Sequence, residues 1–255
     1  MLKKLLKYDL KSGMRIFGFV WLGIAVMTGL ICLIFSTSSD GDGMSLIGTL
    51  GMVPLMIGII GSVLFANIYV ALRFYKGLLG REGYLMFTLP TQPWKLLTSK
   101  LISGVILVAG TTILSLGSIV AIMASMMESF QVDLGWIWEF YGVEISLDWA
   151  VIVTVLGQIV SITASILQIY LACCLAHLST GKRGFLTILY YFVLNSAISF
   201  LSSILQRLFS VGYAESLSGA IANSTLYYTI PFNLGLSILF FVLCELILRK
   251  KLNLE

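Results

Sequence analysis

Long apolar stretches alternate with short polar segments along the whole chain of 255 residues. A helix needs about 20 apolar residues to cross the hydrocarbon core of a membrane, and six of these stretches reach that length. The pattern therefore predicts an all-α integral membrane protein with six transmembrane helices. The predicted spans are residues 16–35, 44–72, 101–126, 149–175, 185–205 and 226–248.

Composition supports the same class of protein. Hydrophobic residues make up 58% of the chain and charged residues only 11%, with a mean hydropathy of +1.00. A soluble domain carries about 25% charged residues, so lipid must be the solvent for most of this surface. We therefore expect residues 1–255 to form a single transmembrane domain. The first apolar run is longer than the core of a cleavable signal peptide, and we expect it to remain as a helix.

Residues 1–15 combine leucines at helical spacing with lysines on the remaining positions. This pattern predicts an amphipathic helix lying on the membrane surface. The alternative is a basic tail that only orients the first span. The leucines are Leu2, Leu5, Leu6 and Leu10, and the lysines are Lys3, Lys4, Lys7 and Lys11.

The distribution of charge predicts the orientation of the spans. Of 16 Lys and Arg residues, 15 fall in segments on one side of the membrane, and only Arg207 falls on the other side. Eight of the 12 acidic residues accompany Arg207. Because basic residues accumulate on the cytoplasmic side, both termini are predicted to lie in the cytoplasm.

The spans lack the residues that an intramembrane enzyme or a proton-coupled carrier needs. His177 is the only histidine, and no pair of carboxylates lies within the spans. Glu245 near the end of the last span is expected to pair with Arg249 at i+4. The turn Thr180–Arg183 contains Gly-Lys but lacks the rest of a phosphate-binding loop. We expect no catalytic, cofactor-binding or metal-binding residue in this chain, and the four cysteines are interpreted as reduced packing residues.

The longest basic connection, residues 73–100, contains a compact apolar group. A short helix is expected from about Lys76 to Phe87, because Pro90 disfavours helix before it. Such a helix would present Tyr84, Leu85 and Phe87 between charged residues. This arrangement is typical of a docking surface for another protein. A helix lying flat on the bilayer is the alternative.

The sequence of this connection, REGYLMFTLP followed by TQPWKLLTSKLI, resembles the cytoplasmic connection between spans two and three in type-2 ATP-binding-cassette (ABC) permeases. It is most similar to the short six-span permeases of Gram-positive bacteria. The resemblance implies that this stretch is the coupling helix that docks on a partner ATPase. The residues that carry the match are Arg81, Glu82, Gly83, Tyr84, Leu85, Phe87, Thr88, Leu89 and Pro90, and Lys95 and Lys100 match basic residues that lead into the third span.

The resemblance also implies a function and a set of partners. The chain would be the permease subunit of an exporter in the bacterial plasma membrane, with a hydrophobic or amphipathic cargo such as a peptide, a lipid or a drug. ATP and Mg would bind to a separate cytoplasmic ATPase, present in two copies. A second permease subunit, identical or paralogous, would complete the transporter within membrane lipid, and no nucleic acid is expected. The alternative is a membrane scaffold or antimicrobial-peptide immunity protein that acts by binding without transport.

Polar residues inside the predicted spans form two rows at helical spacing. Polar side chains avoid lipid, so each row is expected to face another helix or a cavity. Hydrogen bonding between helices is one interpretation, and a weakly polar translocation path is the other. The first row contains Gln158, Ser161, Ser165 and Gln168, the second contains Asn195, Ser199, Ser202, Ser203 and Gln206, and Asn67 is a lone candidate in the second span.

Overall fold

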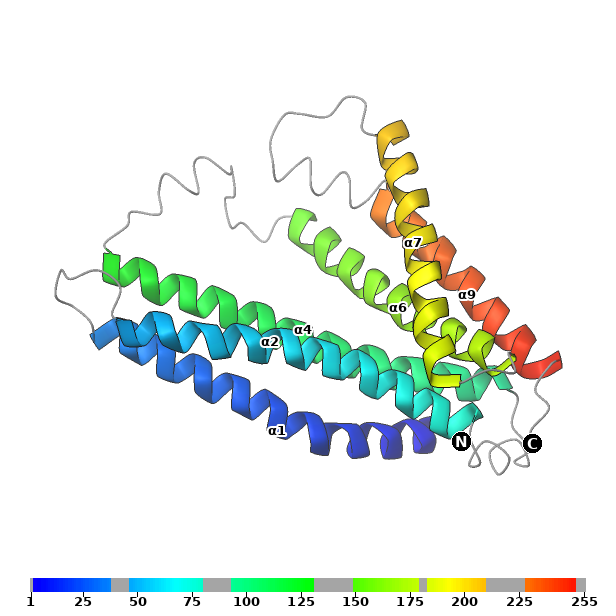
Figure 1. Ribbon diagram of the computed structural model, residues 1–255, viewed down its shortest axis with the longest axis horizontal. Helices are drawn as coiled ribbons and strands as arrows, with labels where there is room; N and C mark the ends of the chain where they lie inside the picture. The colour runs from blue at the N-terminus through cyan, green and yellow to red at the C-terminus, as the bar shows by residue number, and fades with distance from the viewer. Residues whose placement is uncertain are drawn as a thin grey trace. The chain divides into compact units, whose positions relative to one another are not determined.

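The computed structural model describes residues 2–37, 46–79, 93–130, 149–178, 183–209 and 228–250, and these residues are helical throughout. The predicted all-α class is therefore confirmed for the described part of the chain. Figure 1 shows the order of the elements along the chain. They are α1 (Leu2–Thr37), α2 (Leu46–Phe74), the π-helix η1 (Tyr75–Leu79), α4 (Pro93–Phe130), α6 (Trp149–Leu178), α7 (Arg183–Phe209) and α9 (Ile230–Lys250).

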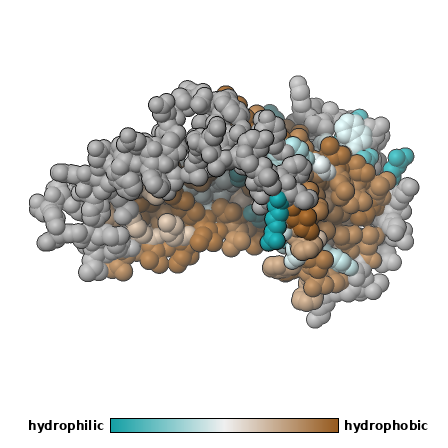
Figure 2. Space-filling view, turned by 90° about the horizontal axis from the view of Figure 1, so that it is seen from above, coloured by the Kyte–Doolittle hydropathy of each residue, from teal (hydrophilic) through white to brown (hydrophobic). Residues whose placement is uncertain are grey.

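Six stretches of these helices are long and apolar enough to cross a membrane, as the hydropathy pattern predicts. They cover Leu6–Phe35, Leu50–Leu79, Trp94–Ser125, Ile152–Leu178, Gly184–Leu205 and Ile230–Arg249. On the face drawn in Figure 2, most of the described surface is hydrophobic. Many large apolar side chains are exposed, including Phe19, Ile113 and Phe200. A face of this kind requires an apolar solvent, so the chain has the character of a multi-pass membrane protein.

Helix α1 is continuous from Leu2 to Thr37, so the basic segment at residues 1–15 and the first span share one helix. The described side chains of its first turns include exposed Lys7 and Lys11. Helix α2 also continues through Pro54. A proline inside a membrane helix is tolerated where the carbonyl that loses its partner is compensated locally.

Contacts divide the chain into two compact units. The first unit contains α1, α2 as far as Ile68, and α4 from Ile106 onward. The second unit contains the end of α2 from Tyr69, η1, the start of α4 as far as Val105, and helices α6, α7 and α9. Helices α2 and α4 therefore contribute residues to both units. In the second unit, α6 packs against α7, α9 and η1.

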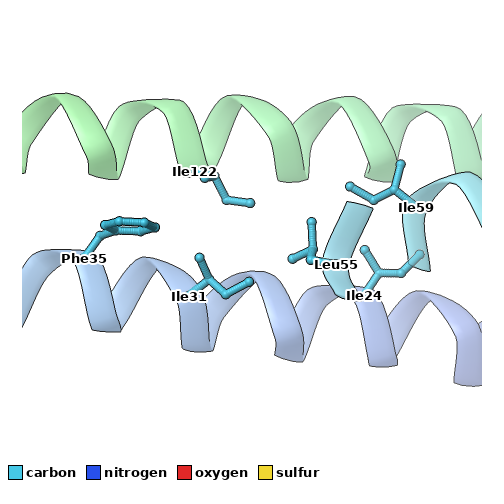
Figure 3. Close-up of a cluster of buried hydrophobic side chains, with 6 residues drawn as sticks. All are labelled: Ile24, Ile31, Phe35, Leu55, Ile59 and Ile122. Atoms are coloured by element: carbon cyan, nitrogen blue, oxygen red, sulfur yellow. The ribbon is translucent and has the colours of Figure 1, made fainter. Parts of the chain in front are cut away.

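The first unit has an aliphatic core between its three helices. Figure 3 shows its side chains converging from α1, α2 and α4. Its buried members are Ile24, Ile31, Phe35, Leu55, Ile59 and Ile122. Lipid is as apolar as these side chains, so close van der Waals contact, rather than escape from water, holds such a core together in a membrane.

A tryptophan inserts against a glycine in the same unit. The Trp21 Nε1–H donates to Thr111 Oγ1 at 3.1 Å, and the indole ring lies directly over Gly110. A Cβ on Gly110 would come within 2.8 Å and 2.9 Å of the indole atoms Cζ2 and Cη2. A glycine is therefore required at this point for α1 and α4 to approach each other.

Replacing Gly110 by alanine should destabilise the first unit by about 1–3 kcal/mol, because the added methyl group overlaps the indole ring. Gly117 in the same helix is the matched control, since nothing lies within 4 Å of a Cβ added there. Gly117→Ala should stabilise the helix by roughly 0.5–1 kcal/mol, because alanine loses less backbone conformational freedom on folding than glycine does. Thermal unfolding in detergent compares the two variants, and equal effects would contradict the packing assigned to Trp21.

Candidate coupling site and intramembrane polar residues

The predicted docking segment falls in residues 80–92, outside the described residues. This applies to Arg81, Glu82, Gly83, Tyr84, Leu85, Phe87, Thr88, Leu89 and Pro90 alike. The elements that flank the segment are described, and both belong to the second unit: η1 ends at Leu79, and α4 begins at Pro93. The structure therefore shows how the chain is held on either side of this segment.

Both flanks are anchored by buried side chains. In η1, Gly77, Leu78 and Leu79 are buried, and the first turns of α4 bury Leu96 and Leu97. A π-helix is a rare element that frequently marks functional sites, because its widened turn shifts the residues that follow it. The chain therefore enters and leaves residues 80–92 from fixed positions.

Lys100 is buried at the start of α4 and lies against η1. A Cβ on Gly77 would sit 3.4 Å from Lys100 Cε and 3.5 Å from Lys100 Nζ. The ammonium group therefore occupies the space that a side chain at residue 77 would fill. Helix carbonyls carry partial negative charge at a carboxyl end, so a cation is favourable beside the end of α2 and η1.

Tyr170 of α6 contacts both the start of α4, at Lys100, and the end of α2, at Phe74. Its Oη donates to the Lys100 carbonyl oxygen at 3.1 Å. Its ring stacks on Phe74, with ring centroids 4.0 Å apart and an angle of 12° between the planes. Gly104 admits this packing, because a Cβ there would lie 3.2 Å from Val70 Cγ1 and 3.3 Å from Tyr170 Oη.

We call Phe74, Gly77, Lys100, Gly104 and Tyr170 the junction. It joins the end of α2, η1, the start of α4 and the last third of α6 in one packed group. The sequence analysis placed Phe74, Gly77 and Lys100 in the connection of residues 73–100, but of the five residues it singled out only Lys100. A tyrosine within an apolar span was the available signal, because a buried phenol needs a hydrogen-bond acceptor.

Basic residues near the junction pack against aromatic rings. The Arg73 Nη1 donates to Tyr69 Oη at 2.9 Å, and its guanidinium lies 5.7 Å from the centre of that ring. The Lys95 ammonium lies 5.4 Å from the centre of the Trp94 ring. Paired aromatic and basic side chains of this kind suit a membrane–water interface.

The polar row on α6 passes from exposed to buried positions. Gln158 is exposed, Ser161 and Ser165 are half-buried, and Gln168 is buried with 7% of its surface accessible. Ser165 Oγ donates to the Ile162 carbonyl at 2.8 Å. The Gln168 Nε2 has no hydrogen-bond partner among the described residues. The deepest member of the row is therefore a buried donor that its neighbours leave unsatisfied.

The remaining polar candidates differ in their surroundings. Asn67 is half-buried in the first unit, and its Nδ2 donates to the Val63 carbonyl at 2.8 Å. On α7, Asn195 and Ser199 are exposed, and Ser202 is half-buried with its Oγ donating to the Ser199 carbonyl at 2.9 Å. The structure therefore brings none of these α7 residues into the interior of the described chain.

The cysteines are free, as the sequence predicts. Cys173, Cys174 and Cys244 are buried. The expected ion pair between Glu245 and Arg249 is wrong, since no ion pair joins them within the described part of α9. Across the described ranges, no group of three His, Cys, Asp or Glu residues could hold a metal ion.

Comparison with protein-family models, with curated proteins and with solved structures gives no match.

Removing the hydroxyl group of Tyr170 should weaken the junction while the stack on Phe74 remains. Tyr170→Phe leaves the Lys100 carbonyl without its donor, and we expect a loss of about 0.5–1.5 kcal/mol in unfolding free energy. Tyr8→Phe is the control, because Tyr8 is 72% exposed. Chemical denaturation in mixed micelles measures both, and an unchanged Tyr170→Phe variant would contradict the hydrogen bond.

Replacing Gln168 by methionine should stabilise the second unit. Methionine has a similar length, and the change removes a buried donor whose lack of a partner costs about 1–3 kcal/mol. Gln158→Met is the control, since Gln158 is exposed and its replacement relieves no buried donor. Thermal unfolding decides the question: destabilisation by Gln168→Met would mean that the amide is satisfied by a bound water or ligand.

Proposed function

We propose that this chain is the permease subunit of an ATP-driven exporter in a bacterial plasma membrane, with both termini in the cytoplasm. A separate ATP-binding-cassette ATPase would bind ATP and Mg, and residues 80–92 would dock on it. The cargo would be a hydrophobic or amphipathic molecule such as a peptide, a lipid or a drug. The proposal starts from the resemblance carried by Glu82–Leu85 and Thr88–Pro90 and from the charge pattern of the loops.

One structural observation supports the proposal most directly: the two flanks of residues 80–92 meet at the junction. A force applied to this segment would reach α2 through η1 and would reach α4 through Leu96 and Leu97. The Tyr170 contacts with Phe74 and with the Lys100 carbonyl would extend the force to α6. A loop held only at its surface would absorb such a push, whereas packed side chains transmit it, because protein interiors are close-packed.

The polar row on α6 would offer the proposed cargo a weakly polar route. Serine and glutamine side chains on α6 carry no formal charge, and one end of the row reaches the buried Gln168. Uncharged walls suit a molecule with a large apolar part and a few hydrogen-bonding groups. A free ion would need several oxygen ligands in place of its water shell, which a single glutamine does not supply.

The docking assignment is tested by co-purifying the chain with any ABC ATPase that a neighbouring gene encodes. Tyr84→Glu and Leu85→Glu should abolish association, because each places a charge within an apolar contact. Gln92→Glu is the matched control: it adds the same charge to the same segment at a polar position, and the complex should persist.

A second variant distinguishes docking of the ATPase from transmission of its motion to the spans. Lys100→Met keeps the length of the side chain but removes its charge beside Gly77, and ATPase association should remain while cargo-dependent stimulation of ATP hydrolysis falls. If the unmodified chain binds no ATPase at all, the exporter proposal is overturned and a scaffold or immunity protein becomes the better explanation.

A further inference from the structure

Three basic side chains of the second unit gather at the end of α2. Arg73 lies in the last turn of α2, and Lys76 and Gly77 follow it in η1 by three and four residues. These three positions are therefore neighbours on one face of the helix. The Lys100 ammonium reaches the same face from α4, because its Nζ lies 3.5 Å from a Cβ built on Gly77. We call Arg73, Lys76 and Lys100 the basic cluster.

The positive charge of the basic cluster exceeds the negative charge around it. The carboxyl end of a helix carries about half a negative charge, which is small beside three cations. Among the described residues of the second unit, Glu245 on α9 is the one acidic residue. Its carboxylate forms no ion pair with any residue that the structure describes. The basic cluster therefore carries a net positive charge, which an anionic ligand would neutralise.

The basic cluster lies at the depth of lipid headgroups. The span Leu50–Leu79 has 30 residues, or about 45 Å, which matches a whole bilayer with its headgroups. Arg73 and Lys76 lie about 9 Å and 4.5 Å before the end of this span, and Lys100 lies about 9 Å after Trp94, where the next span begins. Since the headgroup layer is about 5–8 Å thick, the cluster lies at its border with the hydrocarbon.

The surroundings of Arg73 suit a phosphate group that is attached to an acyl chain. The Arg73 Nη1 donates to Tyr69 Oη at 2.9 Å, which turns the guanidinium back along α2 toward the hydrocarbon. A guanidinium can bind two phosphate oxygens at once, whereas an ammonium acts as a point charge. Leu72, next to Arg73, is 51% exposed and offers an acyl chain an apolar surface. Charge and apolar contact are therefore available side by side.

We infer that the basic cluster binds the phosphodiester anion of a glycerophospholipid with net negative charge, of which phosphatidylglycerol is a simple example. Arg73 holds two phosphate oxygens, Lys76 and Lys100 neutralise the charge, and an acyl chain lies along Leu72. Basic pockets between membrane helices bind anionic headgroups in this way. The bound lipid contacts both flanks of residues 80–92. The inference requires no ATPase, no cargo and no particular orientation of the chain, so it goes beyond the proposed function.

Native mass spectrometry of the full chain in detergent micelles tests the inference by counting bound lipids. Phosphatidylglycerol is titrated against phosphatidylcholine with the same acyl chains, and the first lipid retained should be phosphatidylglycerol. Lys76→Gln should weaken this binding roughly fivefold, the effect of one basic residue beside an anionic headgroup. Arg73→Gln should weaken it at least as much, because it also removes the two-pronged contact. Lys76 is exposed, so its replacement should leave the fold intact, which thermal unfolding checks.

Lys95→Gln is the matched control. Lys95 lies about 140° around α4 from Lys100, and its ammonium is 5.4 Å from the centre of the Trp94 ring. Its replacement removes the same charge near the same membrane surface and should leave binding of the first lipid unchanged.

Three results would overturn the inference. Equal weakening by Lys95→Gln and Lys76→Gln would show a diffuse attraction to anionic lipid, with no site at the basic cluster. Phosphatidylcholine bound as tightly as phosphatidylglycerol would show that the net charge of the headgroup is not recognised. Displacement of the lipid by inorganic phosphate at the same concentration would show that a soluble anion is the ligand.

Discussion

The packing of this protein depends on one constraint: helices in a membrane gain nothing by hiding apolar groups from lipid. Close approach and hydrogen bonding must therefore hold the helices together. Gly110 and Gly104 serve the first need, because each leaves space for an aromatic side chain of another helix, Trp21 in one case and Tyr170 in the other. The same constraint explains why the spans contain polar residues and why most of those residues are already satisfied.

Hydroxyl groups inside the helices satisfy themselves. Buried residues such as Thr28, Ser103 and Ser115 donate to carbonyls three or four residues earlier in their own helices, so they need no partner. Amides are more demanding, since each offers two donors and an acceptor. Gln168 and Asn195 make no such bond, the first in the interior of the second unit and the second on its surface. These two amides are therefore polar groups of the spans that remain able to bind another molecule.

The junction connects this packing logic to the proposed mechanism. A buried lysine is unfavourable unless its surroundings favour a cation, and the end of α2 with η1 provides partial negative charge beside the bare backbone of Gly77. The main-chain carbonyl of the same lysine accepts the Tyr170 hydroxyl. Lys100 thus links two other helices, one through its side chain and one through its backbone. A change at residues 80–92 that displaced this lysine would alter both contacts together.

The sequence alone determined the all-α class and the six apolar spans, because span length and hydropathy depend only on local composition and the thickness of the bilayer. It also located the polar rows, since helical spacing is a local property. Only the tertiary structure decided which row is covered: Gln168 and Asn195 read alike in the sequence, yet one is buried and the other exposed. The junction was equally out of reach, because Tyr170 and Lys100 are separated by 70 residues. Contacts between distant residues depend on how helices pack, and an apolar sequence in an apolar solvent specifies that packing only through shape and a few hydrogen bonds.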